Sequence, residues 1–159
     1  MKLHTYKTHI TWTGNDGTGT CSYKSYRRDH TIDAAGKPEI SASSDPSFRG
    51  DPIRYNPEEL LVASLSSCHM LWYLHLCSVN NVVVLEYTDS ATGDMQENPD
   101  GSGQFVRVLL RPQVKIAARS NPAKAFALHA EAQKLCFLAR SVNFPVEAAP
   151  EVTSEEGSP

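Results

Sequence analysis

One stretch decides the fold of this 159-residue chain: NPEELLVASLSSCHMLWYLHLC, at residues 56–77. Asn56 is a favourable N-cap, Pro57 suits the first helical position, and the two glutamates that follow favour the positive end of a helix dipole. From Leu60 onward nearly every position is apolar or small, so the predicted helix has no polar face. We therefore predict a helix over residues 56–79 that is buried at the centre of the fold and is too short to span a membrane.

Strand-like segments are expected before this helix. Alternating residues predict strands within residues 4–43, with a turn at residues 15–17 and a return strand at residues 19–28. A further hairpin is expected around residues 35–38. Residues 44–55 hold two Pro, one Gly, two Asp and two Arg, which is typical of a loop, and the length of this loop suggests a function.

Strands and a helix also follow the central helix. Strands are predicted over residues 82–117, with an Asn-Pro-Asp-Gly turn from residue 98, and a second helix is predicted over residues 121–140. A short C-terminal strand and a tail account for residues 142–159. The pattern predicts a single α+β domain over residues 1–159, with an antiparallel sheet packed on the two helices.

Composition excludes several classes of function. The net charge is -3, from 15 basic and 18 acidic residues, and the basic residues are scattered, so nucleic-acid binding is not expected. The first residues lack the apolar run of a secretory signal, and we predict a cytoplasmic protein without a membrane partner. Because stable disulfides are uncommon in a reducing cytosol, the four cysteines suggest packing, metal binding or redox chemistry.

Cys68 is the cysteine whose surroundings suggest chemistry. On a helix, Cys68 shares its face with residues that form a largely apolar surface suited to an organic substrate: Leu61, Ser64, Leu65, Leu71, Trp72 and His75. Cys77 lies nine residues further on, points roughly 180° away and is about 13 Å along the axis, so it is assigned to core packing. Zinc is disfavoured because the chain has no CxxC or HxxxH spacing, and His69 diverges from Cys68 by roughly 100°.

The stretch from Asn56 to Cys68 resembles the signature of the OsmC/Ohr family of organic hydroperoxide reductases, including the interval from Glu58 to the cysteine. The element order and a late cysteine, Cys136, resemble the family as well. The resemblance implies an intertwined homodimer with Cys68 as peroxidatic and Cys136 as resolving cysteine, and with a loop arginine and Glu58 completing the site. It also implies an organic hydroperoxide substrate, a thiol reductant such as a dihydrolipoyl protein, and no cofactor. The chain departs from the family in Phe137, where Pro often stands.

Physical arguments support these roles and leave alternatives open. An apolar pocket disfavours a thiolate, so a cation must assist Cys68, and the loop before the helix is the nearest source. Arg49 is the chosen arginine, and the alternatives are Arg54, Arg27 and Arg28. Glu58 either orients that arginine or serves only the start of the helix. Cys136, on a core-facing helix, is preferred as resolving cysteine over Cys21 among polar residues.

Two further hypotheses concern the source of the glutamate and the class of function. On one continuous helix Glu58 and Cys68 are about 15 Å apart, which predicts that a second subunit supplies the glutamate to each site. A non-enzymatic binder of small hydrophobic ligands, on the same fold and with an inert Cys68, is the alternative to a peroxidase.

Overall fold

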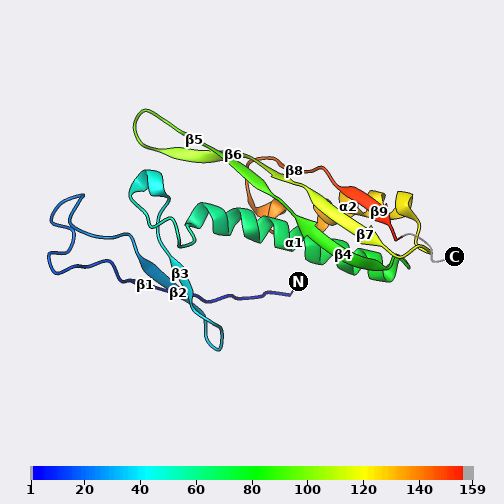
Figure 1. The fold of residues 1–159 in the computed structure, drawn as a ribbon, viewed down its shortest axis with the longest axis horizontal. Coiled ribbons are helices and arrows are strands. Elements are labelled where there is room, and N and C mark those ends of the chain that lie inside the picture. The colour runs from blue at the N-terminus through cyan, green and yellow to red at the C-terminus, as the bar shows by residue number, and fades with distance from the viewer. Residues whose placement is uncertain (1, 156–159) are drawn as a thin grey trace. The chain divides into compact units, whose positions relative to one another are not determined.

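The computed structural model describes residues 2–155 and forms two compact units, with the division after Leu60. Figure 1 traces the order of the elements along the chain. The α+β class is confirmed, and the single-domain organisation stays a prediction.

The first unit holds a three-stranded antiparallel sheet in the order β1-β2-β3. Its strands are β1 His9–Trp12, β2 His30–Asp33 and β3 Ile40–Ala42. The hairpin around residues 35–38 is confirmed as the connection of β2 to β3. The predicted return strand at residues 19–28 is wrong. The Asn15 side chain accepts hydrogen bonds from the backbone N–H groups of Gly17 and Gly19, at 3.0 and 2.9 Å, which coils the chain locally and delays its return to β2.

The predicted loop at residues 44–55 contains one turn of 3-10 helix, η1 Pro46–Phe48. The Asp45 side chain caps η1 by accepting a hydrogen bond from the Ser47 N–H at 2.7 Å. η1 ends at Arg49, whose φ of 67° lies in the left-handed region. The loop is therefore held in a defined shape by its own side chain and backbone contacts.

The central helix α1 spans Pro57–Val79 and starts where the sequence predicts. Asn56 Oδ1 accepts a hydrogen bond from the Glu59 N–H at 2.8 Å, and Glu59 Oε2 accepts one from the Asn56 N–H at 3.2 Å, which makes a capping box. Burial on every face was expected, but α1 buries one stripe of residues at four-residue intervals: Leu65, His69, Tyr73 and Cys77. Within this chain only that stripe of α1 is fully buried, and Leu71 on another face is 63% exposed.

α1 also corrects the statement that the helix is too short to span a membrane. It is 23 residues long and, within residues 2–155, is the one helix that meets the length and composition of a membrane span. A single such helix is weak evidence, because core helices of soluble proteins meet the same criterion.

The second unit holds two three-stranded sheets, in the orders β4-β7-β9 and β5-β6-β8. The strands are β4 Val84–Asp89, β5 Thr92–Glu97, β6 Gly103–Leu110, β7 Pro112–Ile116, β8 Val146–Ala148 and β9 Glu151–Ser154. The two C-terminal strands pair in parallel with β6 and β7, so both sheets are mixed. β5 lies within the range 82–117 for which strands are predicted, but no alternation of apolar residues marks it as a separate strand, because all its residues are exposed.

The second helix α2 spans Pro122–Leu135, which is shorter than the predicted residues 121–140. The Asn121 side chain caps it through the Lys124 N–H at 3.0 Å. At Cys136 the backbone turns to an extended conformation, with φ -62° and ψ 110°, and a 3-10 turn, η2 Ala139–Ser141, follows. One core cluster joins α1, β7 and α2 through buried residues that include Tyr73, Ile116 and Ala132.

Candidate active site

The two cysteines chosen from the sequence meet in the second unit. Cys68 lies at mid-length of α1 and is half-buried, and Cys136 is the C-cap of α2 and is 1% exposed. Both are free thiols. Burial, and then a hydrogen bond with Cys68, raises the pKa of the Cys136 thiol to about 11, so this thiol is protonated at neutral pH. The Ala139 N–H donates to Cys136 Sγ at 3.4 Å and helps to fix its position.

An apolar pocket of about 370 Å³ opens on Cys68. It is lined by Cys68, Leu71, Trp72, His75 and Phe137. The Trp72 ring meets both the Phe137 ring and the His75 ring edge-on, with centroid distances of 5.4 and 5.9 Å. This aromatic wall suits an organic molecule that presents one polar group to the sulfur.

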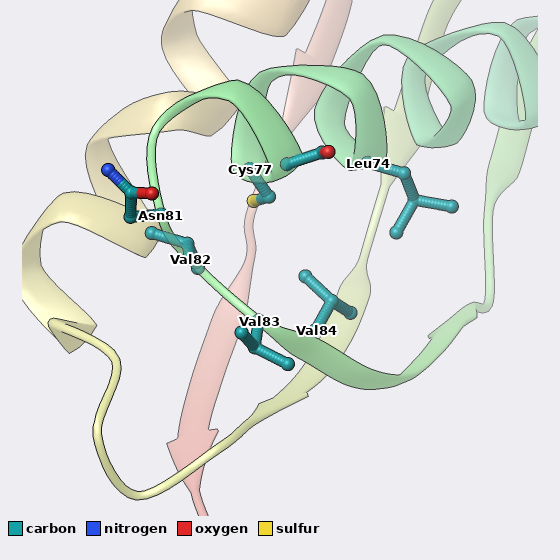
Figure 2. Close-up of a pocket in the computed structure, with 7 residues that line it drawn as sticks. Leu74, Cys77, Asn81, Val82, Val83 and Val84 are labelled. Atoms are coloured by element: carbon teal, nitrogen blue, oxygen red, sulfur yellow. The ribbon is translucent and has the colours of Figure 1, made fainter.

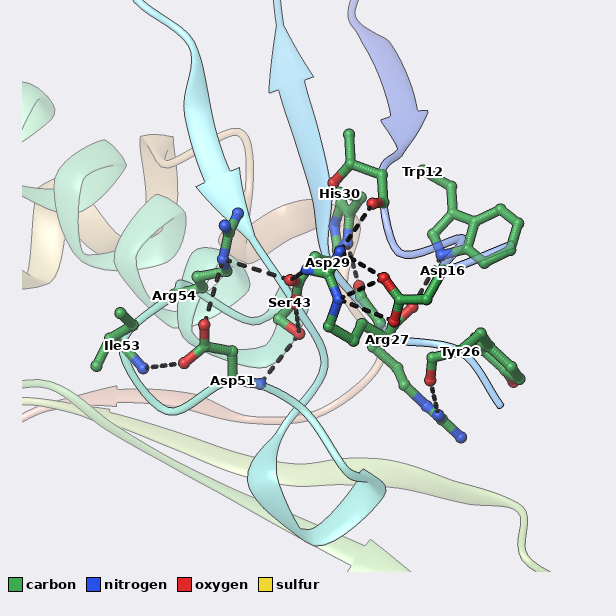
Figure 3. A network of polar contacts seen from close by, with 12 residues as sticks. Trp12, Asp16, Tyr26, Arg27, Asp29, His30, Ser43, Asp51, Ile53 and Arg54 are labelled. Carbon is green, nitrogen blue, oxygen red and sulfur yellow. Dashed lines mark hydrogen bonds and ion pairs between the residues drawn. The ribbon is translucent and has the colours of Figure 1, made fainter. Parts of the chain in front are cut away.

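The loop arginines of the first unit differ in their partners. Arg27 pairs with Asp16 and with Asp29, and Arg54 lies 3.4 Å from Asp51 and 3.9 Å from Asp29 (Figure 3). These two guanidinium groups therefore already have carboxylate partners, which makes them poorer donors to another anion.

Arg49 and Arg28 have no carboxylate partner within residues 2–155 and lie over aromatic rings instead. The Arg49 guanidinium lies 5.9 Å from the Tyr23 ring centroid. Arg28 lies 4.4 Å from the Tyr23 centroid and 4.1 Å from that of Tyr26, and it donates to two backbone carbonyls. Arg49 has the fewer contacts of the two, so it remains the better candidate for an anionic sulfur.

Glu58 is free to bind a cation because its neighbour makes the helix cap. Glu59, and not Glu58, forms the capping box with Asn56. Glu58 is half-buried, and its Oε2 atom is buried without a hydrogen-bond partner. Arg49 and Glu58 both belong to the first unit, and their role beside Cys68 stays a prediction.

Cys21, the rival resolving cysteine, lies exposed in the loop between β1 and β2 of the first unit. Hydrogen bonds with Ser25 and then Thr18 lower the pKa of its thiol. Cys136 interacts with Cys68 within the second unit, and the choice of Cys136 over Cys21 as resolving cysteine stays a prediction.

A pair of buried histidines, one of them next to Cys68 in the sequence, was not predicted from the sequence. His69 from α1 and His129 from α2 are 0% and 3% exposed, and their facing nitrogens Nε2 and Nδ1 are 3.0 Å apart. The four-residue interval between His69 and Tyr73 was the available signal for a polar stripe on α1. Nothing in the sequence near His129 indicated its partner.

A second crevice of about 380 Å³ lies at the C-terminal end of α1 (Figure 2). Cys77 lines it together with Asn81 and the valines at positions 82–84. Cys77 also belongs to the core cluster, as expected, and burial raises the pKa of its thiol. Within residues 2–155, no group of three or more His, Cys, Asp or Glu side chains is placed to hold a metal ion.

Comparison with known proteins places this arrangement in a family. A family model described as OsmC-like protein matches residues 50–151. The chain belongs to the OsmC-like family. A solved OsmC-like protein of unknown function from Vibrio cholerae is similar over 94% of this chain and 100% of that one, with 32% identity and a TM-score of 0.84. A comparison with curated proteins finds no match.

Two solved structures described as organic hydroperoxide resistance proteins share the OsmC-like fold. One is from Elizabethkingia anophelis, with 18% identity, a TM-score of 0.68 and coverage of 98% of this chain and 100% of that one. The other, a putative one from Vibrio cholerae, has captopril bound in one of its active sites, 19% identity, a TM-score of 0.61 and coverage of 94% and 93%. At these identities the likeness shows the fold alone.

Proposed function

We propose that this OsmC-like protein is a thiol peroxidase that reduces organic hydroperoxides to alcohols. The observation that carries the proposal is that two free thiols, Cys68 and Cys136, lie near enough to influence each other's ionisation, and that Cys68 opens on an apolar pocket. The family includes organic hydroperoxide resistance proteins, which supports the same reaction class.

The reaction balances with these two cysteines. The Cys68 thiolate attacks the outer oxygen of the hydroperoxide, the O–O bond breaks, and the alkoxide takes a proton and leaves as the alcohol. Cys68 is then a sulfenic acid. The Cys136 sulfur attacks the Cys68 sulfur, and the thiol proton of Cys136 leaves with the hydroxyl group as water. An external dithiol, such as a dihydrolipoyl group, reduces the disulfide through a mixed disulfide and is itself oxidised.

The cation for the Cys68 thiolate is proposed to be Arg49, oriented by Glu58. An arginine stays charged in an apolar pocket and can hydrogen-bond both the sulfur and the departing alkoxide. The free carboxylate oxygen of Glu58 is suited to hold that guanidinium. We expect Arg49→Ala to slow sulfenate formation by about a hundredfold, which is the loss of one charge-stabilising group. Arg54→Ala is the matched control, because Arg54 is already paired with two carboxylates.

We also propose a homodimer with composite sites, which the length of α1 supports. About 15 Å of helix separates Glu58 from Cys68 on the same chain, so one arginine fork cannot contact both. The exposed Leu71 beside the pocket is a suitable surface for a second copy. Refolding Cys68→Ser chains with Glu58→Ala chains should restore activity that neither parent has. Confirmed heterodimers without activity would place the glutamate in its own chain or outside catalysis.

The experiment that tests the function compares cumene hydroperoxide with hydrogen peroxide, each with dithiothreitol and with dihydrolipoamide as reductant. We expect faster consumption of cumene hydroperoxide, because its aryl group fills the aromatic pocket. A non-enzymatic binder with an inert Cys68 would consume neither peroxide. In that case Cys68 would also react no faster than Cys77 with a thiol reagent at neutral pH.

A further inference from the structure

The buried histidine pair links the two helices that carry the cysteines. His69 Nε2 lies 3.0 Å from His129 Nδ1, and the two rings are within 8° of parallel. On its other side the His129 ring stacks on Tyr73 of α1, with centroids 3.8 Å apart and an angle of 12°. His129 is thus held by two α1 residues that are one helical turn apart.

The position of this contact relative to the sulfur atoms is specific. His69 directly follows Cys68 on α1, and His129 precedes Cys136 by seven residues, close to two turns of α2. A hydrogen bond at this position constrains the rotation and the axial shift of α2 against α1, one residue from Cys68 and about 10 Å along the helix from Cys136.

We propose that His69 and His129 are positioning residues that hold the Cys136 thiol in register with Cys68 for disulfide formation. This inference rests on the proposed function and deepens it, because it assigns the control of the resolving step to a pair outside the pocket. A disulfide needs Cα atoms about 4.4–6.8 Å apart. A slip of α2 by one residue moves Cys136 by about 1.5 Å along the helix and roughly 100° around it, which takes the thiol away from Cys68.

The pair can hold this register because it has little freedom to find other partners. Both rings are buried, and neither His69 Nδ1 nor His129 Nε2 has a hydrogen-bond partner within residues 2–155. The His69–His129 hydrogen bond is therefore the closest polar contact of either ring within residues 2–155, and the Gln133 side chain is a second, weaker hydrogen-bond neighbour of His69. Breaking the His69–His129 hydrogen bond would leave a buried donor or acceptor unpaired. The packing of α1 and α2 that keeps this hydrogen bond is therefore strongly favoured.

The first test measures the Cys68–Cys136 disulfide equilibrium in glutathione buffers, with the full chain and with the disulfide assigned by mass spectrometry of its peptides. His129→Phe retains a ring for Tyr73 but cannot hydrogen-bond His69, and we expect it to lower the equilibrium constant at least tenfold. His129→Asn places an amide near the position of Nδ1, and His69→Gln does so near Nε2, so both should restore it to within about threefold of wild type. Tyr87→Phe is the matched control, because it removes a buried hydroxyl of the same region that has no hydrogen-bond partner.

A second measurement separates positioning from a general loss of structure. In a single turnover with cumene hydroperoxide, His129→Phe should form the Cys68 sulfenate, trapped with dimedone, within twofold of the wild-type rate. Its disulfide should form at least ten times more slowly. Equal slowing of both steps would assign the pair a merely structural role and overturn the proposal.

The wild-type protein provides a check that needs no substitution. A slowly exchanging imidazole N–H should appear in its proton NMR spectrum in both the reduced and the disulfide state. Its absence from either state would overturn the proposal even where a variant fails to fold. A wild type that forms the disulfide with glutathione but not with any hydroperoxide would refute the peroxidase and leave the positioning role intact. If the Cys68–Cys136 equilibrium with glutathione is unchanged in His129→Phe, the positioning role is refuted and the peroxidase proposal is unaffected.

Discussion

Two cysteines of the same helix, Cys68 and Cys77, lie beside cavities of similar volume and yet have different surroundings. The pocket at Cys68 is about 370 Å³ and has an aromatic wall, and the Cys68 thiol interacts with the thiol of Cys136 at the end of α2. The crevice at Cys77 is about 380 Å³ and is lined largely by valines and other residues of α1 and of the chain that follows it. A cysteine beside a cavity is therefore not enough to define the candidate site. The site at Cys68 is distinguished by the second thiol and by the aromatic lining of its pocket.

The largest expected effect comes from exchanging each of these two sulfur atoms for oxygen. Cys68→Ser should lower turnover of cumene hydroperoxide by more than about a thousandfold, because the nucleophile itself is lost. Cys77→Ser should leave turnover within twofold. Peroxide consumption at matched circular-dichroism spectra is the measurement, and equal losses in both variants would remove the distinction between the two cysteines.

The partner thiol is the next element of the comparison. Cys136→Ser should still allow one oxidation at Cys68, but it should lower turnover with dihydrolipoamide by about a hundredfold, because the sulfenate has no neighbouring thiol to condense with. Cys21→Ser is the control and should change neither the single oxidation at Cys68 nor the turnover with dihydrolipoamide. Mass spectrometry after stoichiometric peroxide should detect a Cys68–Cys136 disulfide in the wild type, and a Cys68–Cys21 link would show that the resolving cysteine was misassigned.

The buried pair His69 and His129 should make the fold sensitive to acid. Burial, and then the neighbouring His69, lowers the pKa of His129 to about 3, and burial also lowers the pKa of His69, partly opposed by the Asp89 carboxylate. The two imidazoles are therefore protonated near pH 6.5 in the unfolded chain but stay neutral in the native chain. The free energy of unfolding is highest above pH 6.5 and decreases as the pH falls toward 3.

From pH 7 to pH 5, His129 alone should lower the free energy of unfolding by about 2 kcal/mol. Urea unfolding at both pH values measures this change. His129→Phe should reduce the difference between them, and a wild-type difference that survives the substitution would assign the acid sensitivity to other groups.

The smallest expected effect concerns the pocket wall. Phe137 is 68% exposed and packs edge-on against Trp72. Phe137→Ala should raise the KM for cumene hydroperoxide by about threefold to tenfold, which is 1 kcal/mol or so of lost aromatic contact, and should leave kcat nearly unchanged. Hydrogen peroxide should show no such change in KM, and equal effects on both peroxides would mean that the ring does not contact the substrate.

Local sequence signals predicted the two helices and their starts. Asn56 and Asn121 act as N-caps in the structure because their side chains reach the backbone N–H groups of residues three positions later. Local signals were less successful where the chain has no apolar alternation, as in β5, or where a side chain coils the chain locally, as at Asn15. They also could not show that β8 and β9 pair in parallel, since parallel pairing depends on segments distant in sequence.

The sequence by itself determined the family, the central helix and the placement of Cys68 and Cys77 on different faces, because helix periodicity and capping are properties of neighbouring residues. It suggested Cys136 only through a resemblance. Only the tertiary structure decided that Cys136 lies near enough to Cys68 to interact with it, that Phe137 lines the pocket, and that His69 meets His129 across sixty positions of sequence. These contacts depend on how α2 packs against α1, and packing between distant segments is fixed by the whole core and not by any local pattern.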